Sequence, residues 1–504
     1  MSGFFVLLKT SNQAVAVMKS KLLLLLFTLT TFASAKNITI KGHITGKLPE
    51  TLRYSAPVNG ASGFDIYYTA KVDAAGNFEI NAAIDQVSFI DVFYNYLWAG
   101  NIVAAPGGRY SLEITENKGN VTHVLTGTDD ALQKQYGSIV PFYSISLLHN
   151  LAHEAAEIEA PAEFEAFFDS KYNADTKALT AAVPKNTAVD YLEPLLRERR
   201  YFYATAMSLA LYSKFEHVKY YGGPAIPPAF IALWKGVYTK VTPDKEYIKT
   251  LPVGYWYLKG FEFFKMYEEA GFDGTKIIID PELSREEIRK KSLRHIPAQN
   301  AEYYLAVSQH QNVYEGQMEK YALESYLDFK KAYPASSYTK YLEPEMAPLI
   351  AFFAQSGALP QGAAFVDKYA DINSLEDLIK KFPGKKLYID VWATWCGPCR
   401  DEFKYKDALY KLLAANNITM VYISIDEDAR NEGWKKMISH YGLHGYQIRA
   451  NKALDSSVSH HFSGTESISI PWYILIGSNG EIAVKYATPP SDIAGLEQEI
   501  KGVK

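Results

Sequence analysis

Cysteine is almost absent from this chain of 504 residues, which contains only Cys396 and Cys399. Any sulfur chemistry, whether redox or metal binding, is therefore concentrated at one point of the chain. The net charge is also small. The chain has 52 Lys and Arg and 56 Asp and Glu, which gives a formal net charge of -4. Without a global positive field for phosphates, nucleic acid is not expected as a partner.

A long hydrophobic run is missing as well. The apolar segment 22–32 has 11 residues, whereas a helix needs about 20 residues to cross a bilayer. The segment follows a basic stretch that opens at Met18 and precedes small residues that end at Ala35, which is the pattern of a secretory signal. We expect translation to start at Met18 and residues 1–35 to be an upstream segment and signal peptide.

The mature protein is then expected to begin near Lys36, in the periplasm, either soluble or peripherally associated. No cysteine lies near the cleavage site, which excludes attachment of a lipid there. With 48% hydrophobic residues the chain can fill real cores, and its length predicts roughly two to four domains.

Three stretches differ in their periodicity. Residues 36–127 alternate with period two between Gly, Pro and Asn turns, which predicts an antiparallel β domain. Residues 128–358 have helical periodicity, interrupted by G-G-P-A-I-P-P at 222–228, which predicts an all-α domain. Residues 359–504 alternate apolar strands with amphipathic helices, which predicts an α/β domain. The fold class expected is therefore multidomain, with the α/β domain last.

Within 359–504 the expected elements can be placed more closely. The predicted strands are 386–392, 419–425, 472–476 and 481–486, and the predicted helices are 398–415, 429–441 and 491–502. Both cysteines lie where the first of these strands gives way to the first helix.

Three kinds of chemistry compete for the cysteine pair. A zinc site needs two further ligands, and although His440 and His444 have a suitable mutual spacing, some 40 residues separate them from Cys399. An inert bridge that closes so short a loop would constrain the unfolded chain little. A dithiol that cycles with a disulfide fits best, because Cys396 at the start of a helix favours the thiolate. Cys399, one turn inside, would be the resolving thiol.

The run Y-I-D-V-W-A-T-W-C-G-P-C-R-D-E-F resembles the active site of thioredoxin-fold proteins, and more narrowly of the exported TlpA/ResA-like thiol-disulfide oxidoreductases. The resemblance covers about 364–504. A looser resemblance of the first two domains to TlpA-like proteins of Bacteroidota covers the front of the chain. The segment between Cys399 and Pro471, with V-Y-I-S-I-D-E-D and G-Y-Q-I-R-A, resembles the insertion typical of the TlpA-like branch.

The resemblance implies roles for particular residues. Asp390, six positions before Cys396, corresponds to a buried acid that shuttles the proton of the pair. Pro471, in S-I-P-W-Y-I-L-I, corresponds to the cis-proline beside the disulfide, and the backbone of Ile470 would pair with an incoming peptide.

Three residues around the cysteines complete the expected site. Trp395, Gly397 and Pro398 would contact the substrate polypeptide, whereas Trp392 is expected in the core. Many relatives carry a proline shortly after the acidic residue that follows the pair, but here Glu402 is followed by Phe403, so a straighter helix is expected.

The function expected from these residues is the reduction of disulfides in exported proteins, including apocytochromes. The partners implied are disulfide-bearing protein substrates and a membrane thiol reductase that supplies electrons. No cofactor is expected beyond the Cys396–Cys399 disulfide itself, and no metal. The alternative is a binding or scaffold protein whose front domains hold a ligand or partner, with a passive thioredoxin-like module behind them.

Overall fold

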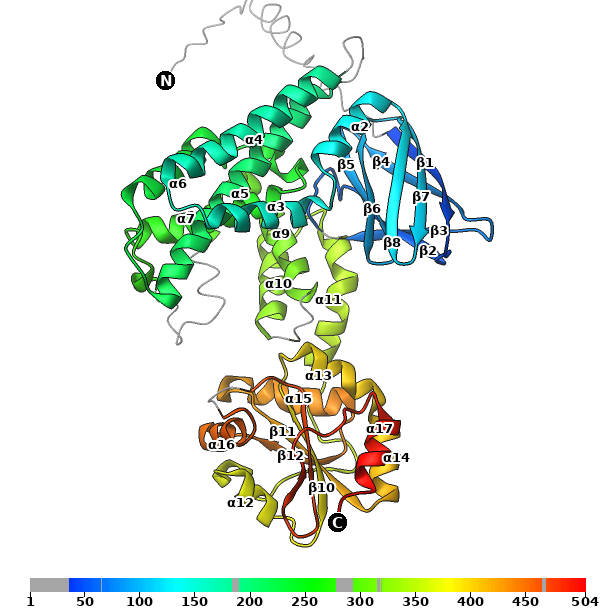
Figure 1. The fold of residues 1–504 in the computed structure, drawn as a ribbon, viewed down its shortest axis with the longest axis vertical. Helices are drawn as coiled ribbons and strands as arrows, with labels where there is room; N and C mark the ends of the chain where they lie inside the picture. Colours follow the sequence, from blue (N-terminus) through cyan, green and yellow to red (C-terminus); the bar gives the residue numbers. More distant parts are fainter. Residues whose placement is uncertain are drawn as a thin grey trace, which may run out of the picture.

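The computed structural model describes residues 36–64, 66–183, 190–277, 293–314, 318, 320–464 and 468–504. The predicted signal segment, 1–35, lies outside the described residues. A β-rich region comes first, a helical middle region packs against its side, and a C-terminal α/β region lies beyond helices α10 and α11 (Figure 1). The predicted domain boundaries at 127 and 358 remain predictions.

The β-rich region contains two four-stranded sheets, ordered β4-β1-β7-β8 and β3-β2-β5-β6. Its strands are β1 Lys36–Thr45, β2 Thr51–Ser55, β3 Tyr67–Lys71, β4 Asn77–Ile84, β5 Ser88–Tyr94, β6 Leu97–Ala104, β7 Arg109–Asn117 and β8 Asn120–Gly127. Alternate residues of both sheets, such as Ile40, Leu112 and Ile90, fill one shared core. The prediction of an antiparallel β domain is wrong for one pair, because β1 and β7 run parallel.

The connection between β2 and β3 leaves the β-rich region and enters the helical one. Its residues Val58, Ala61 and Phe64 are buried in the main helical core. The backbone N–H of Ser62 donates to the carbonyl of Lys249 at 2.7 Å, and the hydroxyl of Tyr303 donates to the carbonyl of Ser62 at 2.8 Å. These contacts fix the two regions to each other.

The middle region is helical throughout its described residues. Its α-helices are α2 Asp130–Ile139, α3 Ser144–Ala156, α4 Pro161–Ala182, α5 Leu192–Tyr221, α6 Pro228–Lys240, α7 Gly254–Glu269, α9 Ala298–Tyr314, α10 Lys320–Ala332 and α11 Thr339–Ala354, and its 3-10 helices are η1 Glu246–Thr250 and η2 Gly274–Lys276. The long helix α5 packs against α3, α4, α6 and α7 and so forms the centre of the region. The predicted interruption at 222–228 separates α5 from α6.

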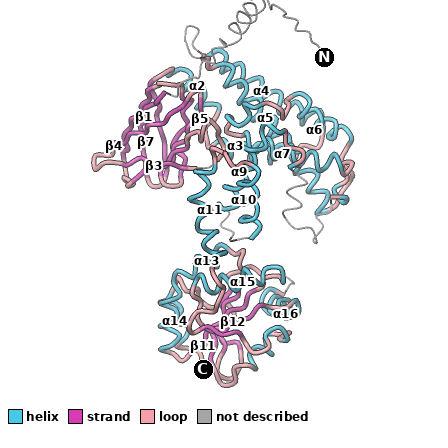
Figure 2. Tube along the Cα trace, turned by 180° about the vertical axis from the view of Figure 1, so that it is seen from behind, coloured by secondary structure: helices cyan, strands magenta, loops and turns pink. Residues whose placement is uncertain are grey.

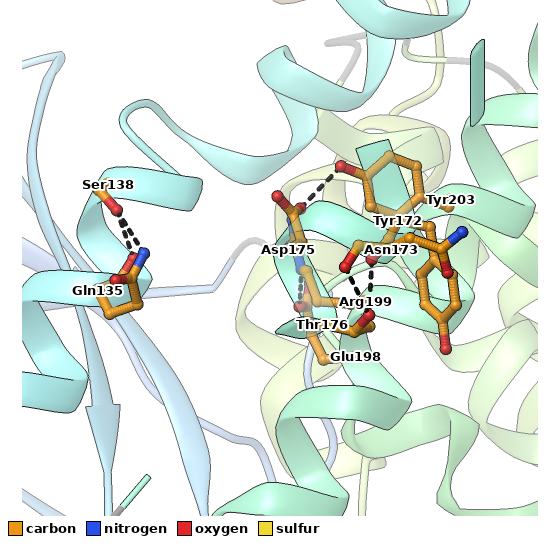
Figure 3. A network of polar contacts seen from close by, with 9 residues as sticks. All are labelled: Gln135, Ser138, Tyr172, Asn173, Asp175, Thr176, Glu198, Arg199 and Tyr203. Atoms are coloured by element: carbon orange, nitrogen blue, oxygen red, sulfur yellow. Dashed lines mark hydrogen bonds and ion pairs between the residues drawn. The ribbon is translucent and has the colours of Figure 1, made fainter. Parts of the chain in front are cut away.

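A buried ion pair lies on α5 (Figure 3). The guanidinium of Arg199 donates to both carboxylate oxygens of Glu198, at 2.5 and 2.6 Å, and both side chains are almost completely buried. Asp175 of α4 lies 3.7 Å from Arg199 and accepts a hydrogen bond of 2.7 Å from the hydroxyl of Tyr203. One guanidinium on α5 thus faces two carboxylates, Glu198 beside it on α5 and Asp175 on α4.

The C-terminal region is built on one six-stranded sheet, ordered β14-β13-β10-β11-β12-β9. Its strands are β9 Ala363–Phe365, β10 Lys386–Trp392, β11 Ile418–Ser424, β12 Gly445–Arg449, β13 Trp472–Ile476 and β14 Ile482–Val484. Its helices are η3 Tyr369–Asp371, α12 Leu375–Lys380, α13 Gly397–Glu402, η4 Phe403–Tyr405, α14 Lys406–Ala415, η5 Asp428–Arg430, α15 Asn431–Tyr441, α16 Lys452–Ser463 and α17 Ile493–Ile500.

Period-two alternation in the strands separates two cores. Leu387 and Ile389 of β10 pack with α12 and α16 on one face of the sheet. Tyr388 and Trp392 pack with α14, α15 and α17 on the other face, together with both cysteines. The expectation that Trp392 lies in the core is confirmed, since its side chain is fully buried.

Two details of the C-terminal region differ from the sequence predictions. The helix predicted over 398–415 is interrupted, because a 3-10 turn at Phe403–Tyr405 separates α13 from α14. The expectation of a straighter helix is therefore wrong. The turn brings Phe403 into the core against Trp392, at 5.3 Å between ring centroids. The last predicted strand, 481–486, is shorter than expected and spans only Ile482–Val484.

The end of the C-terminal region that carries α13 and α15 faces α10 and α11 of the middle region in both views (Figures 1 and 2). Phe352 of α11 is fully buried in the same hydrophobic core as Cys396 and Cys399. None of the helices among the described residues combines the length and apolar character needed to cross a bilayer.

Candidate functional site

The cysteine pair lies at the junction of β10 and α13. Cys396 is the N-cap residue of α13, and it is joined to Cys399 by a disulfide with 5.3 Å between the Cα atoms. The backbone N–H of Cys399 donates to the Cys396 sulfur at 3.1 Å. The same donor is in place to stabilise a thiolate on Cys396 once the disulfide is reduced.

The surface beside the pair is formed by the residues that flank it. Cys396 and Cys399 are buried, at 4% and 1% exposure, whereas Trp395 is 43% exposed. Gly397 is half-buried and Pro398 is exposed, in the first turn of α13. A polypeptide that approached Cys396 would therefore meet Trp395 and Pro398 first.

Asp390 lies on the cysteine side of the sheet, inside the domain. Its register partners are Tyr422 on β11 and Tyr473 on β13, and both tyrosines belong to the core that holds the cysteines. Within the described part of the chain its Oδ1 atom has no hydrogen-bonding partner. Burial raises the pKa of Asp390 well above its usual range, and the nearby carboxylate of Glu402 adds to the rise.

The Ile470–Pro471 peptide bond is cis, as predicted for Pro471. Val391 of β10 pairs with Trp472 of β13, and the two strands are antiparallel. Ile470 and Pro471 directly precede β13. They therefore lie at the end of the sheet where β10 leads into the cysteine motif. The structure thus brings Asp390, the cysteine pair and the Ile470–Pro471 bond together at the carboxyl-terminal end of the central strand β10.

The ring contacts of the two histidines considered as metal ligands are with aromatic residues and not with the cysteines. His440, in the last turn of α15, contacts the ring of Phe352 at 5.4 Å between centroids. The ring of His444 stacks on that of Tyr410. No group of three or more side chains suited to a metal ion occurs among the described residues.

Known proteins resemble this part of the chain. A family model described as Redoxin matches residues 359–500. ResA, a thiol-disulfide oxidoreductase, is 23% identical in Geobacillus thermodenitrificans, over 30% of this chain and 83% of that protein. The Bacillus subtilis ResA is 25% identical over 23% of this chain and 61% of that protein. The C-terminal region thus carries a Redoxin domain and has ResA thiol-disulfide oxidoreductases among its homologues.

Two solved structures are also similar to it. A Bacteroides vulgatus protein provisionally described as a thiol-disulfide oxidoreductase is 32% identical, over 24% of this chain and 76% of that chain, with a TM-score of 0.21. A thioredoxin-family thiol:disulfide interchange protein from Chlorobium tepidum is 24% identical, over 23% of this chain and 79% of that chain, with a TM-score of 0.21.

One buried residue beside the candidate site was not predicted from the sequence. Asp426 is 1% exposed, and its carboxylate accepts two hydrogen bonds from Thr394, two positions before Cys396. A signal was present, because Asp426 closely follows a predicted strand, and parallel neighbouring strands end at the same edge of a sheet. The register that places it opposite Thr394 was needed to recognise it.

Proposed function

We propose that this oxidoreductase is exported and reduces disulfides of periplasmic proteins through Cys396 and Cys399. The observation that carries the proposal is the Cys396–Cys399 disulfide at the start of α13, in the same core as the partners of the buried Asp390. Cys396 is the nucleophile, Cys399 the resolving thiol, and Asp390 the group that takes up and returns a proton.

The exchange proceeds in two displacements. The Cys396 thiolate attacks a substrate disulfide, forms a mixed disulfide and releases one substrate sulfur as a thiolate, which takes a proton. Cys399 then transfers its proton to the Asp390 carboxylate and attacks the Cys396 sulfur, which breaks the mixed disulfide. The substrate has gained two electrons and the pair has become a disulfide. Burial suits Asp390 to this role because it raises the pKa of the carboxyl group.

The proposed substrate contacts are made by the residues that flank the cysteine pair. Trp395, Gly397 and Pro398 form the surface that a polypeptide would cover. The backbone of Ile470, before the cis bond, would pair with an extended segment of the substrate. A chain held in this way presents its disulfide to Cys396.

The direction of exchange is set by the electron supply. The Gly397-Pro398 pair is that of reducing thioredoxins, whose potential is about -270 mV, against about -120 mV for a strong periplasmic oxidant. At about 1.4 kcal/mol per 30 mV, this difference is roughly 7 kcal/mol, so the pair needs a donor in an oxidising compartment. We propose a membrane thiol reductase as that donor and apocytochromes among the substrates. A potential above about -180 mV would indicate an isomerase or oxidase instead.

The location proposed is the periplasm of a Bacteroidota-type cell. It is supported by the signal pattern in residues 18–35. After cleavage the mature protein would be soluble or peripherally associated.

A second candidate is a binding protein whose front regions hold a partner. It is favoured by one observation, that the end of the C-terminal region bearing α13 faces α10 and α11 (Figures 1 and 2). A binder with a passive C-terminal region would show no cysteine-dependent turnover.

Reduction of insulin by the dithiol protein separates the two candidates. We expect turnover with the unmodified chain and none with Cys396→Ser. Cys399→Ser should accumulate mixed disulfides with proteins of the native host, visible as reductant-sensitive bands. Equal turnover by Cys396→Ser, or the absence of any covalent partner in the Cys399→Ser trap, would reject the reductase.

A further inference from the structure

All three polar backbone and side-chain groups of Thr394 are engaged. Its N–H donates to Oδ2 of Asp426 at 2.9 Å, and its hydroxyl donates to Oδ1 of Asp426 at 2.6 Å. Its carbonyl accepts from the guanidinium of Arg400 at 3.3 Å. Thr394 and Asp426 are 6% and 1% exposed. The two carboxylate oxygens of Asp426 therefore hold one residue of the loop between β10 and α13 in a bidentate manner.

Asp426 is itself tied firmly to the sheet. The hydroxyl of Ser424, the last residue of β11, donates to Oδ2 of Asp426 at 2.7 Å. The N–H of Ile425 donates to the carbonyl of Trp392 at 2.9 Å, which extends the pairing of β11 with β10. The carboxylate is thus a fixed point on the sheet against which the loop is placed.

The loop held in this way carries the sulfur. Thr394 is two residues before Cys396, and the N–H of Cys396 donates to the carbonyl of Ala393 at 3.1 Å, which closes a tight turn around Thr394. We propose that Asp426 is a positioning residue that acts through Thr394 to hold the Cys396 sulfur at the start of α13, where the N–H of Cys399 reaches it. The inference rests on the proposed role of Cys396 as the nucleophile.

The charges around Asp426 support this arrangement. Burial raises the pKa of Asp426, while its hydrogen bonds with Thr394 and Ser424 and the charge of Arg430 oppose the rise. Arg449 donates to the backbone carbonyl of Asp426 at 3.2 Å. Hydrogen bonds donated to a carboxylate favour its charged form, so the contacts with Thr394 and Ser424 act against the effect of burial and keep both oxygens as acceptors for the loop.

Thr394→Val is the decisive variant, because it removes the hydroxyl bond and changes neither the charge nor the shape by much. The readout is the rate at which iodoacetamide alkylates Cys396 across a pH series. It is measured in the Cys399→Ser background, where only one thiol remains. Asp426→Asn, Thr394→Ser and the Thr394→Val/Asp426→Asn double variant complete the set. Asp428→Asn is the matched control, since it removes a carboxylate two positions away whose side chain is 96% exposed.

With Thr394→Val we expect alkylation at pH 7 to slow about tenfold, the equivalent of one unit in the midpoint of the pH profile. A loosened loop would let the sulfur leave the N–H donor and would reduce the thiolate fraction. Thr394→Ser should stay within about twofold of the unmodified chain, because its hydroxyl restores the bond. Asp426→Asn should slow alkylation to a similar extent, and the double variant no further than the slower single one.

Three results would overturn the inference. The first is an equal alkylation profile for Thr394→Val and Thr394→Ser. The second is an equal alkylation rate for Asp426→Asn and Asp428→Asn. The third is a double variant whose alkylation rate falls by the product of the two single effects. If Asp426→Asn does not fold, the comparison of Val with Ser at 394 still decides. Alkylation requires no disulfide substrate, so failure of insulin reduction with the expected alkylation rates would reject the proposed reductase and leave the positioning role standing.

Discussion

The ammonium group of Lys436 donates a hydrogen bond of 2.9 Å to the carbonyl of Phe353, at the end of α11. It also donates to the carbonyl of Gln355 at 2.5 Å. A side chain of the C-terminal region thus caps the last helix of the middle region, whose terminal carbonyls carry partial negative charge. Phe352 is buried beside this cap in the core that holds the cysteines.

Lys436→Met should therefore loosen the junction between the two regions while leaving each region folded. It leaves two carbonyls without their charged donor, and Lys436 is only 8% exposed, so we expect a loss of about 1 to 3 kcal/mol in the free energy of local opening. Hydrogen exchange of the α11 and α15 amides measures this opening. Lys411→Met, on the exposed side of α14, is the control. Equal exchange in the two variants would contradict the prediction.

The buried acid predicts how stability depends on pH. The pKa of Asp390 is raised in the folded protein, so the folded state binds more protons than the unfolded state once the pH exceeds about 4. Stability must then fall as the pH rises toward the folded pKa, by up to about 1.4 kcal/mol for each unit. Asp390→Asn carries no titrating group and should not show this fall.

Urea unfolding of the oxidised protein at pH 5 and pH 8 tests this difference. We expect Asp390→Asn to be more stable than the unmodified chain at pH 8, with a smaller advantage at pH 5. Asp401→Asn serves as the control, because the hydrogen bond from Lys404 lowers the pKa of Asp401. A pH-independent difference between Asp390→Asn and the unmodified chain would show that desolvation of Asp390 does not govern stability.

The central strands of the C-terminal region were predicted closely from the sequence, because their apolar runs are typical of buried strands. Strands β10 and β13 have the predicted bounds, 386–392 and 472–476. Strands β9 and β12 were not foreseen. They have three and five residues, too few for periodicity to distinguish a strand from a loop. Their places in the sheet depend on pairing with β11 and with each other.

The direction in which strands pair and the contacts between distant side chains could not be predicted from the sequence, for a related reason. Alternation with period two is the same in parallel and antiparallel strands, so the parallel pair β1 and β7 could not be predicted. The break at Phe403 depends on aromatic partners from other elements. The contact of Asp426 with Thr394 depends on the register of β10 with β11.

The ion pair on α5 predicts a large and specific loss of stability. Arg199→Met leaves Glu198 charged and fully buried without its two hydrogen bonds, which should cost about 3 to 5 kcal/mol. Removing both charges in Glu198→Gln/Arg199→Met should recover part of that loss. Hydrogen exchange of the α4 and α5 amides gives the local free energy. Arg200→Met, at the exposed neighbouring position, should cost far less, and an equal cost would contradict the prediction.

Substitution of Trp395 is predicted to weaken substrate binding and to leave the chemical step unchanged. Its ring is 43% exposed beside the buried Cys396, so Trp395→Ala removes contact area for a polypeptide and leaves the sulfur in place. We expect KM for insulin to rise about tenfold, or about 1.4 kcal/mol of binding free energy, while kcat and the alkylation rate of Cys396 stay within about twofold.

Tyr405→Ala is the matched control for this variant, because Tyr405 is an aromatic residue of similar exposure, 45%, in the turn beyond α13. If general loss of aromatic surface were responsible, both variants would raise KM alike. If Trp395 instead shaped the reactivity of the pair, kcat and alkylation would fall together at unchanged KM. Only a rise in KM confined to Trp395→Ala is consistent with a substrate contact at this position, because uniform binding affects KM and leaves the chemical step unchanged.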